Sequence, residues 1–285
     1  MSVNFPFYKI QGCANDFIVC ELSNLPSGFV ASPKAITEIC DRHVGIGSDG
    51  LLVLGPKNAD TIEVLMFNPD GSEMNMCGNG IRCVVRYLFL KASSEKLPEQ
   101  FNFLVSGRKI GCVTKDRGFN VEVNMGEPSF DPKLVPIATQ HVFQNEDLQV
   151  DGHKIKGWAL SMGNPHFVTF VDKLDVNYAK DIGSKVEHNP FFPKRTNVEF
   201  VRVLARNRIE LLVWERGAGL TMACGTGACA AVVAGILDGA LDSPCKVLLP
   251  GGMLEVNWDS AEKNASVFLL GPAKEVFSGI WSESN

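Results

Sequence analysis

The sequence has no excess of basic residues, no long apolar run and no paired cysteine motif. Its 285 residues carry a net charge of −5, so there is no positive field for a phosphate backbone and we expect no nucleic-acid partner. Apolar stretches such as the one around 84–90 are interrupted by charged residues, here Arg82, Arg86 and Lys91. They are far shorter than the roughly 20 residues that span a bilayer, so we expect no membrane segment.

The N-terminus and the cysteines lack further signatures. The first residues show no basic stretch followed by an apolar core and a cleavage site, which favours a cytoplasmic protein. The nine cysteines are odd in number, form no Cys-x-x-Cys pair and show no zinc-type spacing with histidine. We therefore expect neither a disulfide framework nor a metal site, and any special thiol should act chemically.

The composition is that of an ordinary globular protein. Hydrophobic residues make up 45% of the chain and charged residues 21%, which excludes disordered and fibrous classes. The length exceeds the roughly 100 to 200 residues of a typical single core, so two domains are expected.

An internal repeat supports that expectation. Residues 62–67 resemble residues 209–214, and Ile209 lies 147 residues after Ile62. The same offset carries Cys77 onto Cys224, each at the start of a Cys-Gly-x-Gly motif, and residues 15–19 parallel residues 164–168 at an offset of 149. We infer two homologous α/β domains.

The hydrophobic pattern of each half predicts many strands and few helices. Runs rich in Val, Ile, Phe and Leu predict strands at 50–54, 101–105, 121–123, 167–171 and 198–203. Helices are expected at 33–42, at 80–90, near Tyr178 and at 228–237. This pattern indicates a β-rich α/β fold in which strands wrap around one buried helix per half.

Cys77 and Cys224 stand where the two apolar helices are expected to begin. Two glycines at a helix start cost about 1 kcal/mol each relative to alanine, so they require a reason such as close approach of a ligand. The free N–H groups and partial positive charge of a helix N-terminus attract a carboxylate and favour a thiolate over a thiol. We therefore expect both thiols to have a lowered pKa.

Two such thiols suit the inversion of a carbon stereocentre. That reaction needs a base on one face of the carbon and a proton donor on the other, with the roles exchanged in the reverse direction. The first backbone amides of both helices, at Gly78, Asn79, Gly225 and Thr226, would hold the substrate carboxylate and stabilise an enolate-like transition state. Six other thiols are expected to be apolar filler: Cys20, Cys40, Cys83, Cys112, Cys229 and Cys245.

Seven motifs, in their order and spacing, resemble those of the diaminopimelate epimerases over nearly the whole chain. They lie at 12–17, 67–73, 77–82, 163–166, 195–197, 215–219 and 223–227. The resemblance implies interconversion of LL- and meso-diaminopimelate, on the route to lysine and peptidoglycan, by a homodimer without pyridoxal phosphate, metal or other cofactor.

The resemblance also implies an architecture and a set of site residues. We expect two pseudo-symmetric domains, 1–115 completed by a strand at 270–285, and 116–269, each a strand barrel around a central helix, with the active site in the cleft between them. Cys77 and Cys224 match the acid and base, and Glu215 and His166 resemble residues that tune or orient the thiols. The substrate-binding positions are Asn15, Asn68, Gly78, Asn79, Asn164, Asn197, Glu215, Arg216, Gly225 and Thr226.

Two positions depart from the family pattern. Many members carry Gln where this chain has Gly50, so either one side-chain amide for the substrate is missing and specificity is looser, or a water or backbone group fills the gap. Phe277 replaces a Tyr linked to dimer formation in relatives, which leaves the details of that contact open.

Alternative functions stay open at this point. A proline racemase or hydroxyproline epimerase also uses two thiols, but that group usually has His where this chain has Asn79. A broader amino-acid racemase, or an amino-acid binding protein descended from the epimerases, would keep the fold. The presence of both Cys77 and Cys224 argues against a binding protein. The sequence does not tell which thiol acts as the base in each direction.

Overall fold

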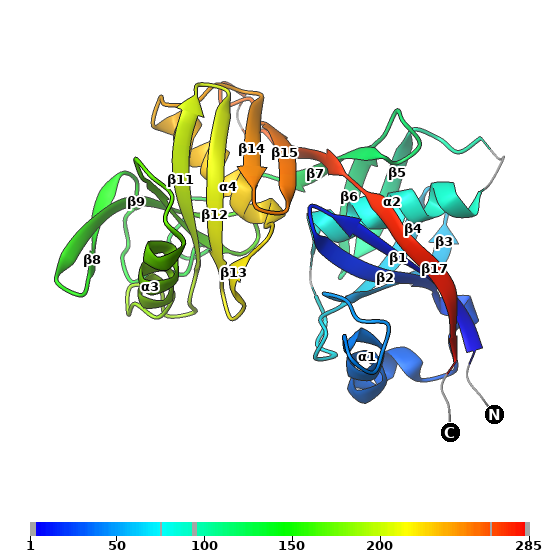
Figure 1. Ribbon diagram of the computed structural model, residues 1–285. Helices are drawn as coiled ribbons and strands as arrows, with labels where there is room; N and C mark the ends of the chain where they lie inside the picture. Colours follow the sequence, from blue (N-terminus) through cyan, green and yellow to red (C-terminus); the bar gives the residue numbers. More distant parts are fainter. Residues whose placement is uncertain (1–3, 75, 93–95, 263, 283–285) are drawn as a thin grey trace. The chain divides into compact units, whose positions relative to one another are not determined.

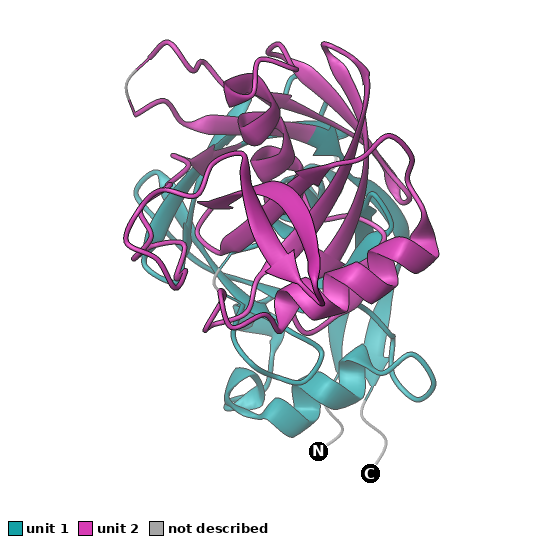
Figure 2. Ribbon diagram, turned by 90° about the vertical axis from the view of Figure 1, so that its left-hand side faces the viewer, with its two compact units in different colours: residues 1–123, 271–285 teal, residues 124–270 magenta. Residues whose placement is uncertain are grey.

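The computed structural model describes residues 4–74, 76–92, 96–262 and 264–282. The chain forms two compact units, shown in separate colours in Figure 2. Unit 1 contains residues 1–123 and 271–285, and unit 2 contains residues 124–270. The chain first passes from unit 1 to unit 2 between residues 123 and 124, later than the expected boundary at 115/116. The reason is that β7 (Asn120–Gly126) begins paired with β6 (Arg108–Val113) of unit 1.

The strands of unit 1 follow one another as hydrogen-bonded neighbours in the order β17-β1-β2-β3-β4-β5-β6-β7. The pairs β2–β3 and β4–β5 are parallel and the others are antiparallel. The remaining bounds are β1 (Asn4–Gly12), β2 (Asn15–Glu21), β3 (Leu51–Asn58), β4 (Thr61–Phe67), β5 (Gln100–Val105) and β17 (Lys274–Ser282). The helices are η1 (Leu22–Asn24), η2 (Phe29–Ala31), α1 (Pro33–Cys40) and α2 (Gly78–Lys91).

Helix α2 is the centre of unit 1. It packs against β1, β2, β3 and β17, and Figure 1 shows it beside these strands. Its buried side chains include Ile81 and Val84, which have no exposed surface. Burial of this apolar surface, at about 25 cal/mol per Å², holds the strands around the helix.

Unit 2 repeats this plan with strands in the order β8-β9-β10-β11-β12-β14-β15-β16, and β13 also pairs with β12. The parallel pairs are β10–β11 and β12–β14. The strands are β8 (Glu146–Val150), β9 (His153–Ser161), β10 (Pro165–Phe170), β11 (Asn197–Ala205), β12 (Arg208–Glu215), β13 (Gly219–Thr221), β14 (Cys245–Leu249), β15 (Gly252–Asn257) and β16 (Val267–Pro272). The helices are α3 (Val176–Glu187) and α4 (Gly225–Leu237).

Helix α4 is the buried centre of unit 2. It packs against β9, β10, β11, β12 and β15, while α3 covers β11, β12 and β13. Ten residues of α4 are buried on all sides, as expected of a helix that is apolar all round. The second half of the chain therefore rebuilds the central-helix plan of the first.

The structure confirms the β-rich α/β class, with 17 strands and four α-helices in its described part. Each predicted strand and helix is present, but α2 and α4 begin at Gly78 and Gly225, earlier than predicted. The glycines belong to the helices because the preceding cysteine is the N-cap. None of the helices in the described ranges is both long and apolar enough to cross a membrane.

Candidate active site

Cys77 and Cys224 occupy the same local position in the two units. Each is the N-cap of its central helix, with extended backbone angles of φ −142°, ψ 110° for Cys77 and φ −130°, ψ 113° for Cys224. Each Sγ accepts a hydrogen bond from the amide three residues later, Gly80 N or Gly227 N, at 3.4 Å in both cases. A thiol in the role usually taken by Ser or Asp thus has a donor that favours its charged form.

The next amides of both helices are open. Within the described ranges, the backbone N–H groups of Gly78, Asn79, Gly225 and Thr226 donate to no protein acceptor. Amides at a helix start have no intrahelical partner and together with the helix dipole bind anions. Each unit therefore presents a thiol beside a site suited to a carboxylate.

In unit 1, a network of side-chain amides lies around Cys77. Asn15 Oδ1 accepts hydrogen bonds from Cys77 Sγ at 3.9 Å and from Asn79 Nδ2 at 3.1 Å. Asp49 Oδ2 accepts from Asn15 Nδ2 at 2.9 Å, and the fully buried Arg82 donates to Asn79 Oδ1 at 2.7 Å. Because Nδ2 of Asn15 donates to Asp49, the oxygen end of its amide faces the thiol.

A charged cluster supports this network from outside. Lys9 and Arg42 form ion pairs with Asp16 at 2.9 and 2.7 Å, and Arg42 also reaches Asp49 at 2.7 Å. Burial acts to raise the pKa of Asp16, but the hydrogen bonds from Arg42 and Lys9 lower it to about 2. Asp49 is not among the predicted site residues, although it adjoins Gly50, which departs from the family pattern.

Asn68 lies in the turn that follows β4. Its backbone N–H donates to Ser72 O at 2.8 Å, and its Nδ2 donates to Ser72 Oγ at 3.0 Å. These are the contacts of a turn former. Its role as a substrate ligand stays a prediction.

In unit 2, a hydrogen-bonded chain leads to Cys224. The sulfur lies 3.5 Å from Thr226 Oγ1, which accepts from Asn164 Nδ2 at 3.3 Å. Asn164 Oδ1 lies 3.0 Å from His166 Nε2, and His166 Nδ1 lies 2.7 Å from Glu199 Oε1. The structure thus joins three predicted site residues to the thiol and adds Glu199, which the sequence analysis missed.

Acidic groups surround Cys224. Burial raises the pKa of Glu215, against hydrogen bonds from the side chains of Thr221, at 2.5 Å, and Cys224. Burial also raises the pKa of the Cys224 thiol well above its ordinary value, and the charges of Glu215 and Glu199 act in the same direction. The expected lowering of this pKa is therefore wrong for Cys224, because burial and two carboxylates outweigh the helix start.

Asn197 and Arg216 are joined to each other. The buried Asn197 donates from Nδ2 to Pro165 O at 2.8 Å and accepts from Arg216 N at 2.9 Å. The side chain of Arg216 is exposed, and its Nη1 reaches Lys194 O at 3.2 Å. Asn197 thereby fixes the backbone of Arg216 and leaves the guanidinium on the surface of unit 2.

Gly50, at the matching position of unit 1, has no space for a side chain. A Cβ there would lie 2.5 Å from Phe67 O and 3.3 Å from two ring carbons of Phe17. Its carbonyl accepts hydrogen bonds from Ile18 N at 3.1 Å and Ser48 Oγ at 3.0 Å. A Gln side chain at this position would require the backbone of β3 or β4 to move.

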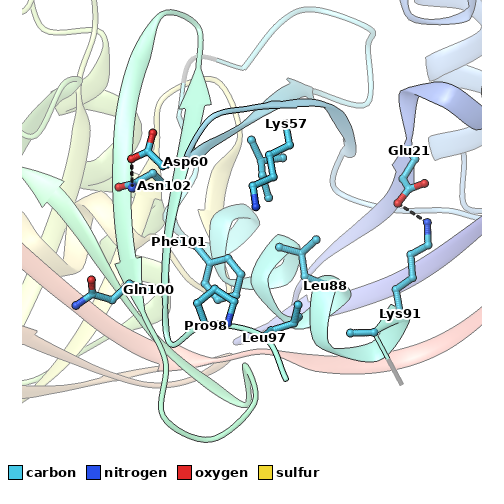
Figure 3. Close-up of a pocket in the computed structure, with 12 residues that line it drawn as sticks. Glu21, Lys57, Asp60, Leu88, Lys91, Leu97, Pro98, Gln100, Phe101 and Asn102 are labelled. Atoms are coloured by element: carbon cyan, nitrogen blue, oxygen red, sulfur yellow. Dashed lines mark hydrogen bonds and ion pairs between the residues drawn. The ribbon is translucent and has the colours of Figure 1, made fainter. Parts of the chain in front are cut away.

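A separate surface pocket of ≈ 470 Å³ lies at the other end of α2 (Figure 3). Leu88 and Lys91 line it, Lys91 pairs with Glu21, and Asn102 donates to Asp60 at 3.0 Å. None of the predicted site residues lines it, so we place the candidate active site at the helix starts instead. In the part of the chain that the structure describes, no three His, Cys, Asp or Glu side chains are placed to share a metal ion.

The fold resembles that of solved two-domain proteins described as an epimerase and as a phenazine biosynthesis protein. A hydroxyproline epimerase from Agrobacterium vitis superposes with a TM-score of 0.70 at 11% identity, over 98% of this chain and 91% of that one. A PhzF-family phenazine biosynthesis protein from Bacillus anthracis gives 0.67 at 13%, over 98% and 99%. At such identities the likeness shows the fold alone.

The sequence comparisons are more specific. The diaminopimelate epimerase family model matches residues 7–131 and 158–276. Diaminopimelate epimerases from Acetivibrio thermocellus and Carboxydothermus hydrogenoformans are 41% and 42% identical, each over 96% of this chain and 97% or 98% of the relative. The chain belongs to the diaminopimelate epimerase family, as its motifs predicted.

Proposed function

We propose that this protein interconverts LL- and meso-diaminopimelate by a two-base mechanism in which Cys77 and Cys224 act on opposite faces of one α-carbon. The observation that carries the proposal is the matched pair of N-capping thiols in a chain of this family. One thiolate removes the α-hydrogen as a proton, and the bonding electron pair passes into the carboxylate as an enolate. The other thiol then donates its proton to the opposite face, so the two sulfurs exchange protonation states in each turnover.

The open amides at the two helix starts suit the binding of the substrate carboxylate. Gly78, Asn79, Gly225 and Thr226 supply N–H groups that stabilise the charge developing on the enolate oxygens. Remaining substrate contacts are assigned to Asn15, Asn68, Asn164, Asn197, Glu215 and Arg216. Glu215, beside Cys224, is suited to pair with the substrate ammonium, and His166 orients the groups around the same thiol.

The direct test is incubation of the reduced protein with LL-diaminopimelate in deuterated water. We expect deuterium at the α-carbon and formation of the meso isomer. Parallel incubations with L-proline and L-glutamate serve as controls for a proline-type or broader racemase. Binding of diaminopimelate without α-exchange would contradict the enzyme and favour a binding protein.

We further propose a homodimer that uses β17. Its side chains Val276, Phe277 and Ile280 expose 53%, 44% and 70% of their surface, and exposed apolar side chains suit a self-complementary contact. Light scattering should give about twice the monomer mass for the parent and the monomer mass for Phe277→Asp. Leu204→Asp, at an exposed apolar position of unit 2, is the matched control, and a parent monomer would contradict the proposal.

The state of the cysteines supports a reducing compartment, which we propose to be the cytoplasm. Among the described residues no cysteine is joined in a disulfide, and eight of the nine are buried. Structural disulfides are rare where thiols are kept reduced. Cell fractionation with an antibody to the native chain tests this location, and recovery from an extracellular fraction would contradict it.

A further inference from the structure

The two units differ at one buried position beside the thiol-bearing helices. A Cβ on Gly80 of α2 would lie 3.3 Å from Leu52 Cδ2, whereas a Cβ on Gly227 of α4 would lie 2.7 Å from Glu199 Oε1. Leu52 and Glu199 are separated by the same 147-residue offset as the two thiols. Glu199 therefore stands where the first repeat has a leucine.

The neighbouring strand differs in the same way. Phe17 of β2 and His166 of β10 are related by the 149-residue offset of their motifs. Unit 1 thus has a buried apolar pair, Phe17 and Leu52, where unit 2 has His166 and Glu199, each with no exposed surface. A buried ion pair is often no more stabilising than apolar residues of similar size, so its presence in one unit indicates a purpose other than packing.

The hydrogen bonds of the pair define where its protons lie. Asn164 donates from Nδ2 to Thr226, so its Oδ1 faces His166 Nε2 at 3.0 Å. A carbonyl oxygen only accepts, so Nε2 must carry a hydrogen. The other ring nitrogen shares a second proton with Glu199 Oε1 at 2.7 Å, either as imidazolium and carboxylate or as imidazole and carboxylic acid.

The donor-to-acceptor direction of these hydrogen bonds continues to the sulfur of Cys224. Because Thr226 Oγ1 accepts from Asn164, its own hydrogen is available to Cys224 Sγ at 3.5 Å. A hydrogen bond to a charged group is worth about 1.5–3 kcal/mol. A thiolate at Cys224, destabilised by burial and by nearby carboxylates, gains from such a donor.

We propose that Glu199 is a positioning residue for the reaction: by holding His166 with a hydrogen on Nε2, it sets the direction of the hydrogen bonds that end on the Cys224 sulfur. This inference rests on the proposed function, in which Cys224 exchanges protons with the substrate. Glu199 itself touches no reacting atom. Its carboxylate acts through His166, Asn164 and Thr226.

The proton position is measurable without turnover. Long-range ¹H–¹⁵N correlation spectra of the five histidines report which ring nitrogens carry hydrogen, and loss of one signal set in His166→Phe assigns the buried ring. We expect Nε2 of His166 to be protonated in the parent. A ring with hydrogen on Nδ1 alone would reverse the chain and overturn the inference.

The effect on the thiol is measured by alkylation. Iodoacetamide labelling at pH 8, followed by peptide mass spectrometry, compares Cys224 with Cys77 in the same molecule. The double variant His166→Phe/Glu199→Leu installs the apolar pair of unit 1 and keeps the core filled, while Thr226→Val removes only the last donor. We expect the Cys224 to Cys77 rate ratio to fall roughly tenfold in both.

Glu210→Gln, at a half-buried carboxylate of β12 that pairs with Arg202, is the matched control and should leave the ratio unchanged. A folded double variant, with a cooperative melt, that keeps the parent ratio would overturn the inference. If the parent shows no α-exchange with diaminopimelate while the ratio still falls, the proposed function fails and the chain to Cys224 stands. If the parent is an active epimerase and the double variant keeps both its kcat and its ratio, the positioning role alone fails.

Discussion

The starts of α2 and α4 share a backbone and differ in electrostatics. Both thiols cap a helix and accept the third amide at 3.4 Å. The side-chain amide of Asn15 contacts Cys77, whereas the carboxylates of Glu215 and Glu199 act on Cys224. Asn68, 147 residues before Glu215, has no charge. The two halves have therefore kept the same geometry at the helix start, while the side chains around each sulfur have diverged.

This difference fits a reaction in which the two sulfurs must always differ in protonation state. Each direction of epimerisation begins with one thiolate and one thiol. Acidic neighbours favour the protonated form of Cys224, whereas the Thr226 hydroxyl favours its thiolate. Opposing influences of this kind keep both states accessible to one group, so the pair can run in either direction.

The largest expected effect comes from removing either sulfur. Cys77→Ala and Cys224→Ala should each lower kcat by at least roughly 10²–10⁴-fold, because one thiol cannot both remove and return a proton on opposite faces. Coupled measurement of meso product gives the rate. Cys83→Ala and Cys229→Ala, at buried thiols of the same helices, are matched controls that should keep turnover, and epimerisation by Cys224→Ala at the parent rate would refute the two-base mechanism.

Oxidation should have the next largest effect. Two thiols that serve one small carbon must approach each other during turnover, so a mild oxidant is expected to join Cys77 to Cys224 and to abolish activity until a reductant is added. Peptide mapping identifies the link, and activity before and after dithiothreitol gives its reversibility. Full activity after oxidation, with no such link, would count against the proximity of the two thiols.

The repeat explains why so much was predictable. The 147-residue offset identified both thiols. Hydrophobic runs located β10 and the first halves of β3 and β11 because consecutive side chains there are buried, and located β5 because its alternate side chains are buried. Glu199 escaped notice because its partner in the repeat is an apolar residue, so the offset gave no signal. The raised pKa of Cys224 depends on side chains from β12 and β11, which no local pattern brings together.

Gly50 and Asn197 occupy matching positions in the two units, and substitutions there should lower the free energy of unfolding for different reasons. Gly50→Ala should lower the free energy of unfolding by about 1–3 kcal/mol, because its Cβ would meet Phe67 O at 2.5 Å. Asn197→Ala should cost a similar amount for another reason, the loss of hydrogen bonds to Pro165 and Arg216. Urea denaturation measures both, and an unchanged midpoint for Gly50→Ala would show that the strand moves aside easily.

The same position bears on specificity. The looser-pocket alternative expects the parent protein to exchange the α-proton of glutamate as well as that of diaminopimelate, since one buried amide that would reject shorter substrates is missing. The alternative in which a backbone group fills the gap expects no glutamate exchange. The parent protein alone decides between them, which avoids a Gln at position 50 that the structure has no room to accept.

The smallest expected effect concerns Glu215 and the pH. Burial raises the folded-state pKa of this carboxyl above its ordinary value, so the favourable contribution of its protonated form is complete at low pH and is lost as the pH rises through the folded-state value. Glu215→Gln places a neutral amide at this position, as Asn68 does at the matching position of unit 1, and so removes this pH-dependent loss of stability. Above neutrality, the melting temperature of this variant should exceed that of the parent by roughly 2–4 °C, the shift that about 1 kcal/mol produces in a domain of this size. The excess should shrink toward pH 4. Turnover should fall because the carboxylate beside Cys224 is gone. Melting curves from pH 4 to 9, with Glu210→Gln as the control, give the comparison. A melting difference that stays constant across this range would mean that Glu215 titrates as an ordinary carboxylate, and that the acidic surroundings of Cys224 do not distinguish unit 2 from unit 1.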